Sequence, residues 1–331
     1  MIAVEHLRKR FGSHEALADV SFTVPKGEIF GFVGPNGAGK TTTIRVLATL
    51  TRGDSGEVSV GGIPIGSDPA AVRAMVGYMP DFFGVYDRLT SREYLDFYAA
   101  CHGVPHQRRR RVADELLELV DLGEKAESAV DTLSRGMKQR LCLARSLVHG
   151  PEILLLDEPA SGLDPRARVE MRELIRELRR MGKTVLISSH ILPELEELCT
   201  WIGFIDGGRM AASGPLGAVR DLVGAGRRLR IQLAGGPGPD GPGVTAEGLE
   251  EGPPAPEDPR LTRVREMVLG RPGVAAAHVV GDHVDVAVAD PSDDHELLAW
   301  LVGRGVEVRS FAPVPGDLSE AFMRLTGEGP E

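Results

Sequence analysis

A glycine-rich run near the N-terminus has the residue types and the spacing to bind phosphate groups. It matches the pattern G-x-x-x-x-G-K-[ST]. Its members, with the threonine that follows, are Gly34, Pro35, Asn36, Gly37, Ala38, Gly39, Lys40, Thr41 and Thr42. The glycines let the backbone wrap closely around phosphate oxygens, so that amide N–H groups point at them. Lys40 supplies positive charge for β- and γ-phosphates, and the Thr41 hydroxyl can ligate Mg²⁺. The alternative is an ordinary glycine-rich turn, but the predicted strand before the run and the predicted helix after it favour a phosphate-binding loop.

Two adjacent carboxylates form a second candidate site. Asp157 and Glu158 directly follow the apolar run Ile153–Leu156, which predicts a buried strand. In open α/β sheets, ligands bind at the carboxyl ends of the strands. Asp157 is therefore placed to hold Mg²⁺, and Glu158 to orient or deprotonate an attacking water. Such a pair could instead cap the next helix, but a phosphate loop in the same chain favours the catalytic interpretation.

The elements that must position these residues alternate between strands and helices up to about residue 225. The predicted strands are Ile2–His6, Val20–Val24, Ile29–Val33, Glu57–Val60, Val76–Met79, Ile153–Leu156, Thr184–Ser188 and Trp201–Ile205. The predicted helices are Lys40–Leu50, Ser91–His102, Arg108–Val120, Gly136–Val148 and Pro165–Met181. Three strands, containing FGFV, ILLL and TVLIS, are apolar almost throughout, which is typical of central parallel strands. Residues 1–225 are therefore assigned to one α/β domain around a parallel sheet.

Residues 226–331 follow a different pattern and are assigned to a smaller accessory domain. Its predicted strands and helices, in chain order, are Leu229–Leu233, Arg260–Leu269, Val274–Val280, His283–Ala289, Asp293–Val302 and Val306–Phe311. This β-α-β-β-α-β order is typical of the ferredoxin-like α+β arrangement. A last helix is predicted over Leu318–Leu325.

An acidic segment interrupts this second domain between its first strand and its first helix. Residues 235–259 contain 7 Gly, 7 Pro and 6 acidic residues, with no Lys or Arg. A segment of this composition buries too little apolar surface to offset the entropy of ordering it. We predict a disordered insertion, with an interaction tail as the alternative.

Composition and charge exclude several classes of protein. The longest stretches without Asp, Glu, Lys or Arg have 11 residues, whereas a membrane-spanning helix needs about 20 mostly apolar residues. The N-terminus has no apolar run behind a basic start, so no secretory signal is expected. The net charge of −10 argues against general nucleic-acid binding. The 3 cysteines have no CxxC spacing, which predicts neither disulfides nor a zinc site and indicates a reducing compartment.

These motifs, together with three further ones, resemble those of the ATP-binding subunit of ABC (ATP-binding cassette) transporters. The run Leu133–Gln139, LSRGMKQ, is similar to the family signature LSGGQ. Ser161–Asp164, SGLD, is similar to its D-loop, and His190 follows a predicted strand where the family has its switch histidine. The resemblance covers residues 1 to about 220. It implies a P-loop NTPase cassette, with a RecA-like core and with antiparallel β and α-helical subdomains, that hydrolyses ATP with Mg²⁺.

The resemblance also assigns roles to individual residues. Phe11 would stack on adenine, where Tyr is common in the family. Two cassettes would dimerise head to tail, so that Ser134 and Gly136 of one copy contact the γ-phosphate held by the phosphate loop of the other. Asp164 would help to shape the dimer contact, and His190 would touch the γ-phosphate and sense hydrolysis.

Two positions depart from the family pattern. Asp81 stands where the Q-loop glutamine is expected, and it could still approach Mg²⁺ or the attacking water. Arg135 replaces the second signature residue, where it either aids phosphate binding or faces solvent. Such LSRGM variants resemble the ABC-2 exporter type, including drug and multidrug efflux ATPases. This implies a separate integral-membrane permease as partner, met near Phe82–Leu89, and a peripheral location at the cytoplasmic face of the cell membrane.

Two other functions remain open at this point. A soluble ABC ATPase acting on nucleic acid or the ribosome is disfavoured, because the chain has one phosphate loop and a net charge of −10; no nucleic-acid partner is expected. The third interpretation is a regulatory or self-resistance module, in which the cassette binds ATP and the second domain has the main role.

Overall fold

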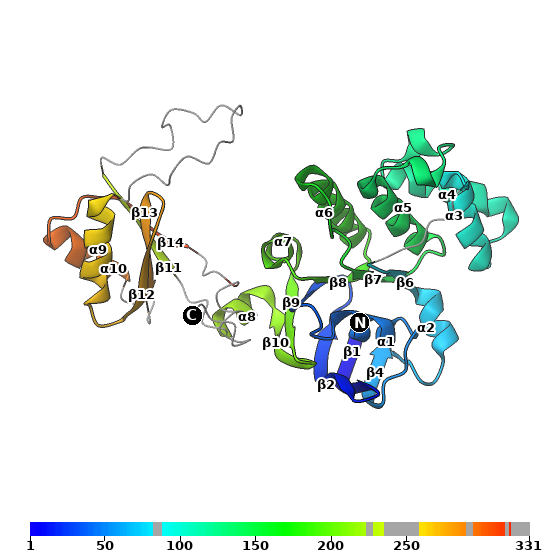
Figure 1. Cartoon of the computed structure of the whole chain (residues 1–331), viewed down its shortest axis with the longest axis horizontal. Coiled ribbons are helices and arrows are strands. Elements are labelled where there is room, and N and C mark those ends of the chain that lie inside the picture. Colours follow the sequence, from blue (N-terminus) through cyan, green and yellow to red (C-terminus); the bar gives the residue numbers. More distant parts are fainter. Residues whose placement is uncertain (82–87, 223–227, 235–257, 289–293, 315–317, 319–331) are drawn as a thin grey trace. The chain divides into compact units, whose positions relative to one another are not determined.

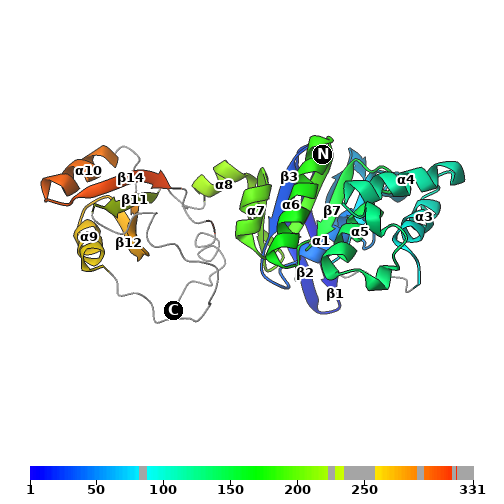
Figure 2. The same ribbon diagram turned by 90° about the horizontal axis from the view of Figure 1, so that it is seen from above.

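The computed structural model describes residues 1–81, 88–222, 228–234, 258–288, 294–314 and 318 (Figures 1 and 2). The chain divides into two compact units, of which the first takes in Met1–Val219 and the second begins at Arg220. The boundary that the sequence places near residue 225 falls within 223–227, outside the described residues. In the part of the chain that is described, no helix is both long enough and apolar enough to cross a membrane.

The first unit is organised around a mixed sheet. Its strands are β1 (Ile2–Phe11), β2 (His14–Val24), β3 (Ile29–Val33), β4 (Ser55–Val60), β5 (Ile63–Pro64), β6 (Val76–Met79), β7 (Ile153–Asp157), β8 (Thr184–Ser189), β9 (Trp201–Asp206) and β10 (Arg209–Pro215). Their order across the sheet is β5-β4-β1-β2-β10-β9-β3-β8-β7-β6. Strands β9, β3, β8, β7 and β6 are parallel. Strands β1, β2, β4 and β5 pair antiparallel, as the family resemblance implies.

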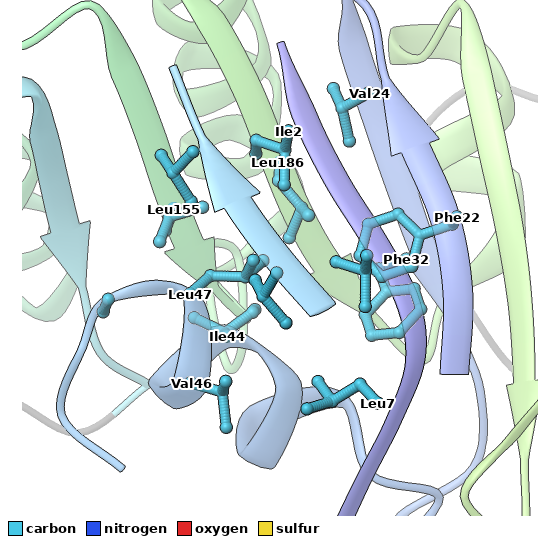
Figure 3. Close-up of a cluster of buried hydrophobic side chains, with 14 of the residues drawn as sticks. Ile2, Leu7, Phe22, Val24, Phe32, Ile44, Val46, Leu47, Leu155 and Leu186 are labelled. Carbon is cyan, nitrogen blue, oxygen red and sulfur yellow. The ribbon is translucent and has the colours of Figure 1, made fainter. Parts of the chain in front are cut away.

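The three strongly apolar runs form the centre of the parallel part, as the sequence predicts. Every residue of β3, β7 and β8 is buried, and β8 lies between the other two, parallel to both. Side chains of the first helix, such as Ile44 and Leu47, belong to the same hydrophobic core as Phe32, Leu155 and Leu186 of these strands (Figure 3). This core holds the carboxyl ends of β3, β7 and β8 side by side, where the candidate residues lie.

Helices connect these strands, and the last of them, α8, includes the boundary between Val219 and Arg220. They are α1 (Lys40–Leu47), α2 (Pro69–Met75), α3 (Ser91–Cys101), α4 (His106–Leu119), α5 (Arg135–Leu147), α6 (Pro165–Arg180), α7 (Leu192–Leu198) and α8 (Leu216–Leu222), with short 3₁₀ turns at Gly123–Lys125 and Val130–Thr132. Helices α3, α4 and α5 form a group of their own (Figure 1) around buried residues that include Tyr94, Leu95, Leu117 and Leu141. This group corresponds to the α-helical subdomain that the resemblance implies.

Five of the strands and α-helices between residues 1 and 222 are absent from the sequence prediction: α2, α7, α8, β5 and β10. The helices have 7 residues each, which is less than the window over which helical periodicity is measured. Strand β10 has the sequence RMAASGP, with little β-propensity. It forms because it pairs with β9 in a tight hairpin across Gly207 and Gly208, which both have positive φ.

The second unit has the predicted β-α-β-β-α-β order. Its elements are β11 (Arg228–Leu233), α9 (Pro259–Leu269), β12 (Val274–Val280), β13 (His283–Val288), α10 (Asp294–Gly303) and β14 (Val308–Val314). The strands form an antiparallel sheet in the order β12-β13-β11-β14. Helix α9 begins at Pro259 and has Asp258 as its N-cap, two residues that composition assigns to the insertion. Of the predicted helix Leu318–Leu325, only its first residue is described.

Candidate functional site

A cleft of about 430 Å³ opens in the first unit beside the carboxyl ends of the central strands. It brings together most of the residues that the sequence selects, although they come from distant parts of the chain. The lining residues are Phe11, His14, Ala16, Pro35, Asn36, Gly37, Gly39, Lys40, Thr41, Thr42, Asp81, Glu158, Ser161 and His190. Gly34 and Ala38 belong to the same loop without lining the cleft.

The glycine-rich run is the loop between β3 and α1, which is the context that the sequence predicts. Gly37 and Gly39 have φ angles of 84° and 109°, a region that side chains rarely adopt. Gly34 is required for a second reason, because a Cβ atom there would lie 2.3 Å from the carbonyl oxygen of Ile205. Gly39 is also the N-cap of α1. The loop therefore ends at a helix N-terminus, whose free amide groups and dipole favour a bound anion.

Lys40 lies inside this loop with 6% of its surface exposed. Its Nζ donates hydrogen bonds to the carbonyl oxygens of Gly34, at 2.6 Å, and Pro35, at 3.1 Å. The same atom lies 3.6 Å from Oε1 of Glu158. Burial lowers the pKa of Lys40, and the nearby carboxylates of Glu158 and Asp157 oppose that change. The ammonium group is thus held between the loop and the candidate catalytic carboxylate.

Asp157 is fully buried at the end of β7, where two hydroxyl groups face it. Thr41 Oγ1 donates to Asp157 Oδ1 at 3.1 Å, and Ser188 Oγ donates to the same oxygen at 2.7 Å. Burial raises the pKa of Asp157, and the negative charge of Asp81 adds to the effect. The other oxygen, Oδ2, is buried and has no hydrogen-bond partner among the described residues. A carboxylate oxygen free to accept, beside a threonine hydroxyl, is a donor set that suits Mg²⁺.

Glu158 is held by contacts on three sides. Its φ angle is +50°, which is uncommon for a residue other than glycine. Its backbone N–H donates to Ser188 Oγ at 3.0 Å. Its Oε2 lies 2.9 Å from Nδ1 of His190, and its Oε1 faces Lys40. Strained backbone of this kind clusters at functional sites, and here it aims the carboxylate into the cleft.

Helix α6 anchors the segment that follows His190. Arg168 Nη1 lies 3.1 Å from Glu194 Oε1 on α7. Arg176 Nη2 donates to the carbonyl oxygen of Glu197 at 2.7 Å, and Arg172 also pairs with Glu197. These contacts tie α7, and with it the position of His190, to α6, whose N-cap is Asp164.

Phe11 ends β1 at the edge of the cleft, and the residue is 50% exposed. It pairs across the strands with His14, and Lys9 Nζ lies 5.2 Å from the ring centroid. An exposed aromatic ring beside a phosphate loop offers a stacking surface for a nucleobase. His14 lines the same cleft and is missing from the sequence prediction. The turn between Phe11 and His14, Gly12-Ser13, is the signal that could have placed it there.

Three predicted residues lie outside both the cleft lining and the elements that form it, the phosphate loop and the acidic pair: Ser134, Gly136 and Asp164. Ser134 is the N-cap of α5 and accepts from the N–H of Met137 at 3.3 Å. Asp164 is the N-cap of α6 and accepts from Ala167 N at 2.9 Å. A Cβ atom at Gly136 would lie 3.2 Å from the Cβ of Ala167, so Gly136 permits close approach of α5 and α6.

Ser188 is a functional candidate that sequence reasoning missed, and Ser161 enters the sequence prediction only as part of the D-loop motif. Ser188 accepts from Glu158 N and donates to Asp157, so it orients both acidic residues. The feature that could have identified Ser188 is the strand register, since Ser188 pairs with Asp157 across β7 and β8. Ser161 lies in the turn after Glu158 and lines the cleft.

Comparisons with known proteins identify relatives of this chain. The sequence model of the family described as ABC transporter matches residues 17–161. The Nod factor export ATP-binding protein I of Burkholderia lata is 43% identical over 328 residues, which cover 98% of this chain and 97% of that protein. The daunorubicin resistance ATP-binding protein DrrA2 of Streptomyces coeruleorubidus is 34% identical over 335 residues, with coverage of 100% and 96%. A solved dimer of an ATP-binding cassette in a post-hydrolysis state, bound to ADP and Pi, is 25% identical with a TM-score of 0.60, covering 65% of this chain and 99% of that one.

Proposed function

This chain belongs to the ABC transporter family as an ATP-binding subunit, and we propose that it powers the export of a substrate through a separate membrane-spanning permease. The observation that carries the proposal is the position of Glu158, between Lys40 of the phosphate loop and His190. That arrangement suits phosphoryl transfer from ATP to water. The export direction rests on likeness over nearly the whole chain to subunits named for export and drug resistance.

In this proposal the chain's own residues position ATP and the attacking water. Lys40 and the loop amides hold the β- and γ-phosphates, and Phe11 stacks on the adenine. Glu158 orients the water and accepts its proton, while His190 holds the carboxylate from the other side. Catalysis then consists of positioning and charge stabilisation, without a covalent intermediate on the protein.

We assign the magnesium site to Thr41 and Asp157. The buried Oδ2 of Asp157, which has no hydrogen-bond partner in the described part of the chain, supports this assignment. A buried carboxylate oxygen without a partner is costly unless a ligand satisfies it. Asp81 lines the cleft and is near enough to affect the pKa of Asp157, which supports a role beside the metal. Magnesium, when bound, would neutralise charge on the phosphate oxygens.

The proposed active form is a head-to-tail dimer of two copies. Ser134 and Gly136 lie at the N-terminus of α5, outside the cleft of their own chain. A second copy would be needed to bring that helix N-terminus to a γ-phosphate, where its dipole is favourable. Asp164 would shape the contact between the copies. The dimeric state of the solved cassette with ADP and Pi supports this arrangement.

The partner in the membrane is a proposed integral-membrane permease, which would keep the chain at the cytoplasmic face. The expected contact region Phe82–Leu89 lies mostly outside the described residues. We propose residues 1–225 as the cassette and 226–331 as an accessory domain with an acidic insertion at 235–259. Likeness to export subunits over both parts favours this function over a nucleic-acid ATPase or a regulatory module.

The deciding experiment measures phosphate release from ATP by the purified full chain with and without Mg²⁺. Glu158→Gln should slow hydrolysis by at least about tenfold, which corresponds to about 1.4 kcal/mol in the barrier. It should also accumulate an ATP-bound dimer on size exclusion. Glu170→Gln is the matched control, because Glu170 is a partly exposed carboxylate on α6 that does not line the cleft. Equal rates for Glu158→Gln and the wild type would contradict the assignment.

A further inference from the structure

Arg135 makes a contact that the family signature LSGGQ, with glycine at this position, cannot make. Its Nη2 donates a hydrogen bond to the carbonyl oxygen of Ser161 at 3.0 Å. The guanidinium also packs against Gly162, whose φ is +65°, and a Cβ atom at Gly162 would lie 2.3 Å from Nη2. The first residue of α5 is therefore connected to the turn that follows the catalytic carboxylate.

A second side chain of α5 strengthens this connection. Gln139 is 3% exposed, and its Nε2 donates to the same Ser161 carbonyl at 3.0 Å. Arg135 and Gln139 are four residues apart, so they lie on one face of the helix. A charged donor and a buried amide thus share one backbone acceptor, and hydrogen bonds from charged donors are the stronger kind.

The contact continues toward the catalytic group. The N–H of Ser161 donates to the carbonyl oxygen of Glu158 at 3.0 Å, and Ser161 lines the nucleotide cleft. Two hydrogen bonds therefore separate Arg135 from the backbone of Glu158. Because Glu158 has a strained φ of +50°, its side-chain direction depends on this turn.

We propose that Arg135 is a positioning residue that couples the two nucleotide sites of the dimer. The proposal rests on the head-to-tail arrangement proposed above. In that arrangement the N-terminus of α5 contacts the γ-phosphate bound by the other copy. Arg135 transmits the position of α5 to Ser161, and so to Glu158, in its own copy. Binding of ATP at one site then helps to set the catalytic carboxylate at the other.

The test is the dependence of steady-state phosphate release on ATP concentration for the full chain. Arg135→Ala should lower kcat by on the order of threefold to tenfold, the range for residues that carry coupling. Its Hill coefficient should fall from a wild-type value above 1 toward 1. Arg135→Lys keeps the charge but cannot both donate to Ser161 and pack flat on Gly162, so it should restore only part of the coupling.

Nucleotide affinity without Mg²⁺, measured with a fluorescent ADP analogue, separates this role from direct phosphate binding. The dissociation constant should stay within about twofold of the wild type in Arg135→Ala, since Arg135 does not line the cleft of its own chain. Arg166→Ala is the matched control, because Arg166 is an exposed arginine on α6. In the double variant Arg135→Ala/Gln139→Ala, the fold decrease in kcat should be smaller than the product of the fold decreases in the two single variants. Both side chains donate to the same acceptor, so their effects are not independent.

Several outcomes would overturn the proposal. An unchanged Hill coefficient and kcat in Arg135→Ala would mean that the contact between Arg135 and Ser161 has no part in coupling. A weakened affinity for the ADP analogue would make it a ligand contact instead. A wild-type enzyme with a Hill coefficient of 1 would show that there is no coupling to transmit. Absence of ATP hydrolysis by the wild type would be different, because it would refute the proposed function rather than the role of Arg135.

Discussion

Oε2 of Glu158 lies 2.9 Å from Nδ1 of His190, although the two residues follow different strands of the sheet. The pairing exists because β7 and β8 are parallel neighbours, with Asp157 in register with Ser188. Residues that follow parallel strands at the same level reach the same edge of the sheet. The other carboxylate oxygen faces Lys40 at 3.6 Å, so His190 and Lys40 hold Glu158 between them.

Loss of His190 should therefore impair turnover more than ATP binding. In His190→Ala, Glu158 keeps its contact with Lys40 but loses the hydrogen-bond partner of its Oε2. We therefore expect kcat to fall by at least about tenfold. The ATP concentration for half-maximal rate should change by less than about threefold, because His190 acts through Glu158 on the attacking water. Steady-state phosphate release over a range of ATP concentrations measures both.

His14→Ala is the control, because His14 lines the same cleft beside Phe11. It should alter the half-saturating ATP concentration with little effect on kcat. If both variants lowered kcat equally, His190 would have no special relation to Glu158.

Asp157 and Ser188 should set the affinity for Mg²⁺. Asp157→Asn removes the negative charge of the proposed ligand, and Ser188→Ala removes the hydroxyl that orients it. We expect both to raise the Mg²⁺ concentration needed for tight ATP binding by roughly tenfold or more. Fluorescent ATP binding titrated with Mg²⁺ measures this without relying on turnover. Asp68→Asn, which alters only the N-cap of α2, should leave the titration unchanged; a similar shift in this control would argue against a specific metal site.

His149 should make the folded state sensitive to acid. Its ring stacks on His102, with centroids 4.1 Å apart and the planes 4° from parallel. Burial, with smaller contributions from His102 and Lys183, lowers the pKa of His149 to about 4, against about 6.5 in an unfolded chain. Between these values the unfolded state binds more protons. The free energy of unfolding should therefore decrease as the pH falls from about 6.5 to about 4, by on the order of 1–3 kcal/mol.

Urea unfolding at several pH values tests this effect in wild type and His149→Gln. Glutamine does not titrate and can still donate to the carbonyl oxygen of Val76, which His149 contacts at 3.1 Å. Below pH 6.5, the free energy of unfolding should decrease more steeply in the wild type than in His149→Gln, because only the wild type has this titrating side chain. His106→Gln, at an exposed site, is the control. If the difference in free energy of unfolding between wild type and His149→Gln did not change with pH, protonation of His149 would be the same in the folded and unfolded states.

Deletion of residues 236–256 should leave ATP hydrolysis nearly intact. These residues come from the Gly-, Pro- and acid-rich insertion of the second domain, whereas the nucleotide cleft belongs to the first unit. We expect kcat within about twofold of the wild type. A large loss, in a variant whose melting temperature is unchanged, would mean that the acidic insertion takes part in the catalytic cycle.

Much of the site was readable from local patterns. The phosphate loop lies between a strand and a helix as its spacing predicts, and Asp157 and Glu158 stand where the apolar strand β7 delivers them. Contacts between residues distant in sequence were not readable. Ser188 orients both carboxylates through strand register, and Arg135, although exposed, donates to the carbonyl oxygen of Ser161.

The sequence by itself determined the chemistry that this protein can perform, because the loop glycines, Lys40 and the acidic pair act through residue type and short-range spacing. The tertiary structure alone decided how Glu158 is held, with Lys40 and His190 on its two oxygens and Ser188 on its backbone. The physical reason is that hydrogen bonds are short and directional. Only packing of the buried strands β3, β7 and β8 brings these groups within that distance.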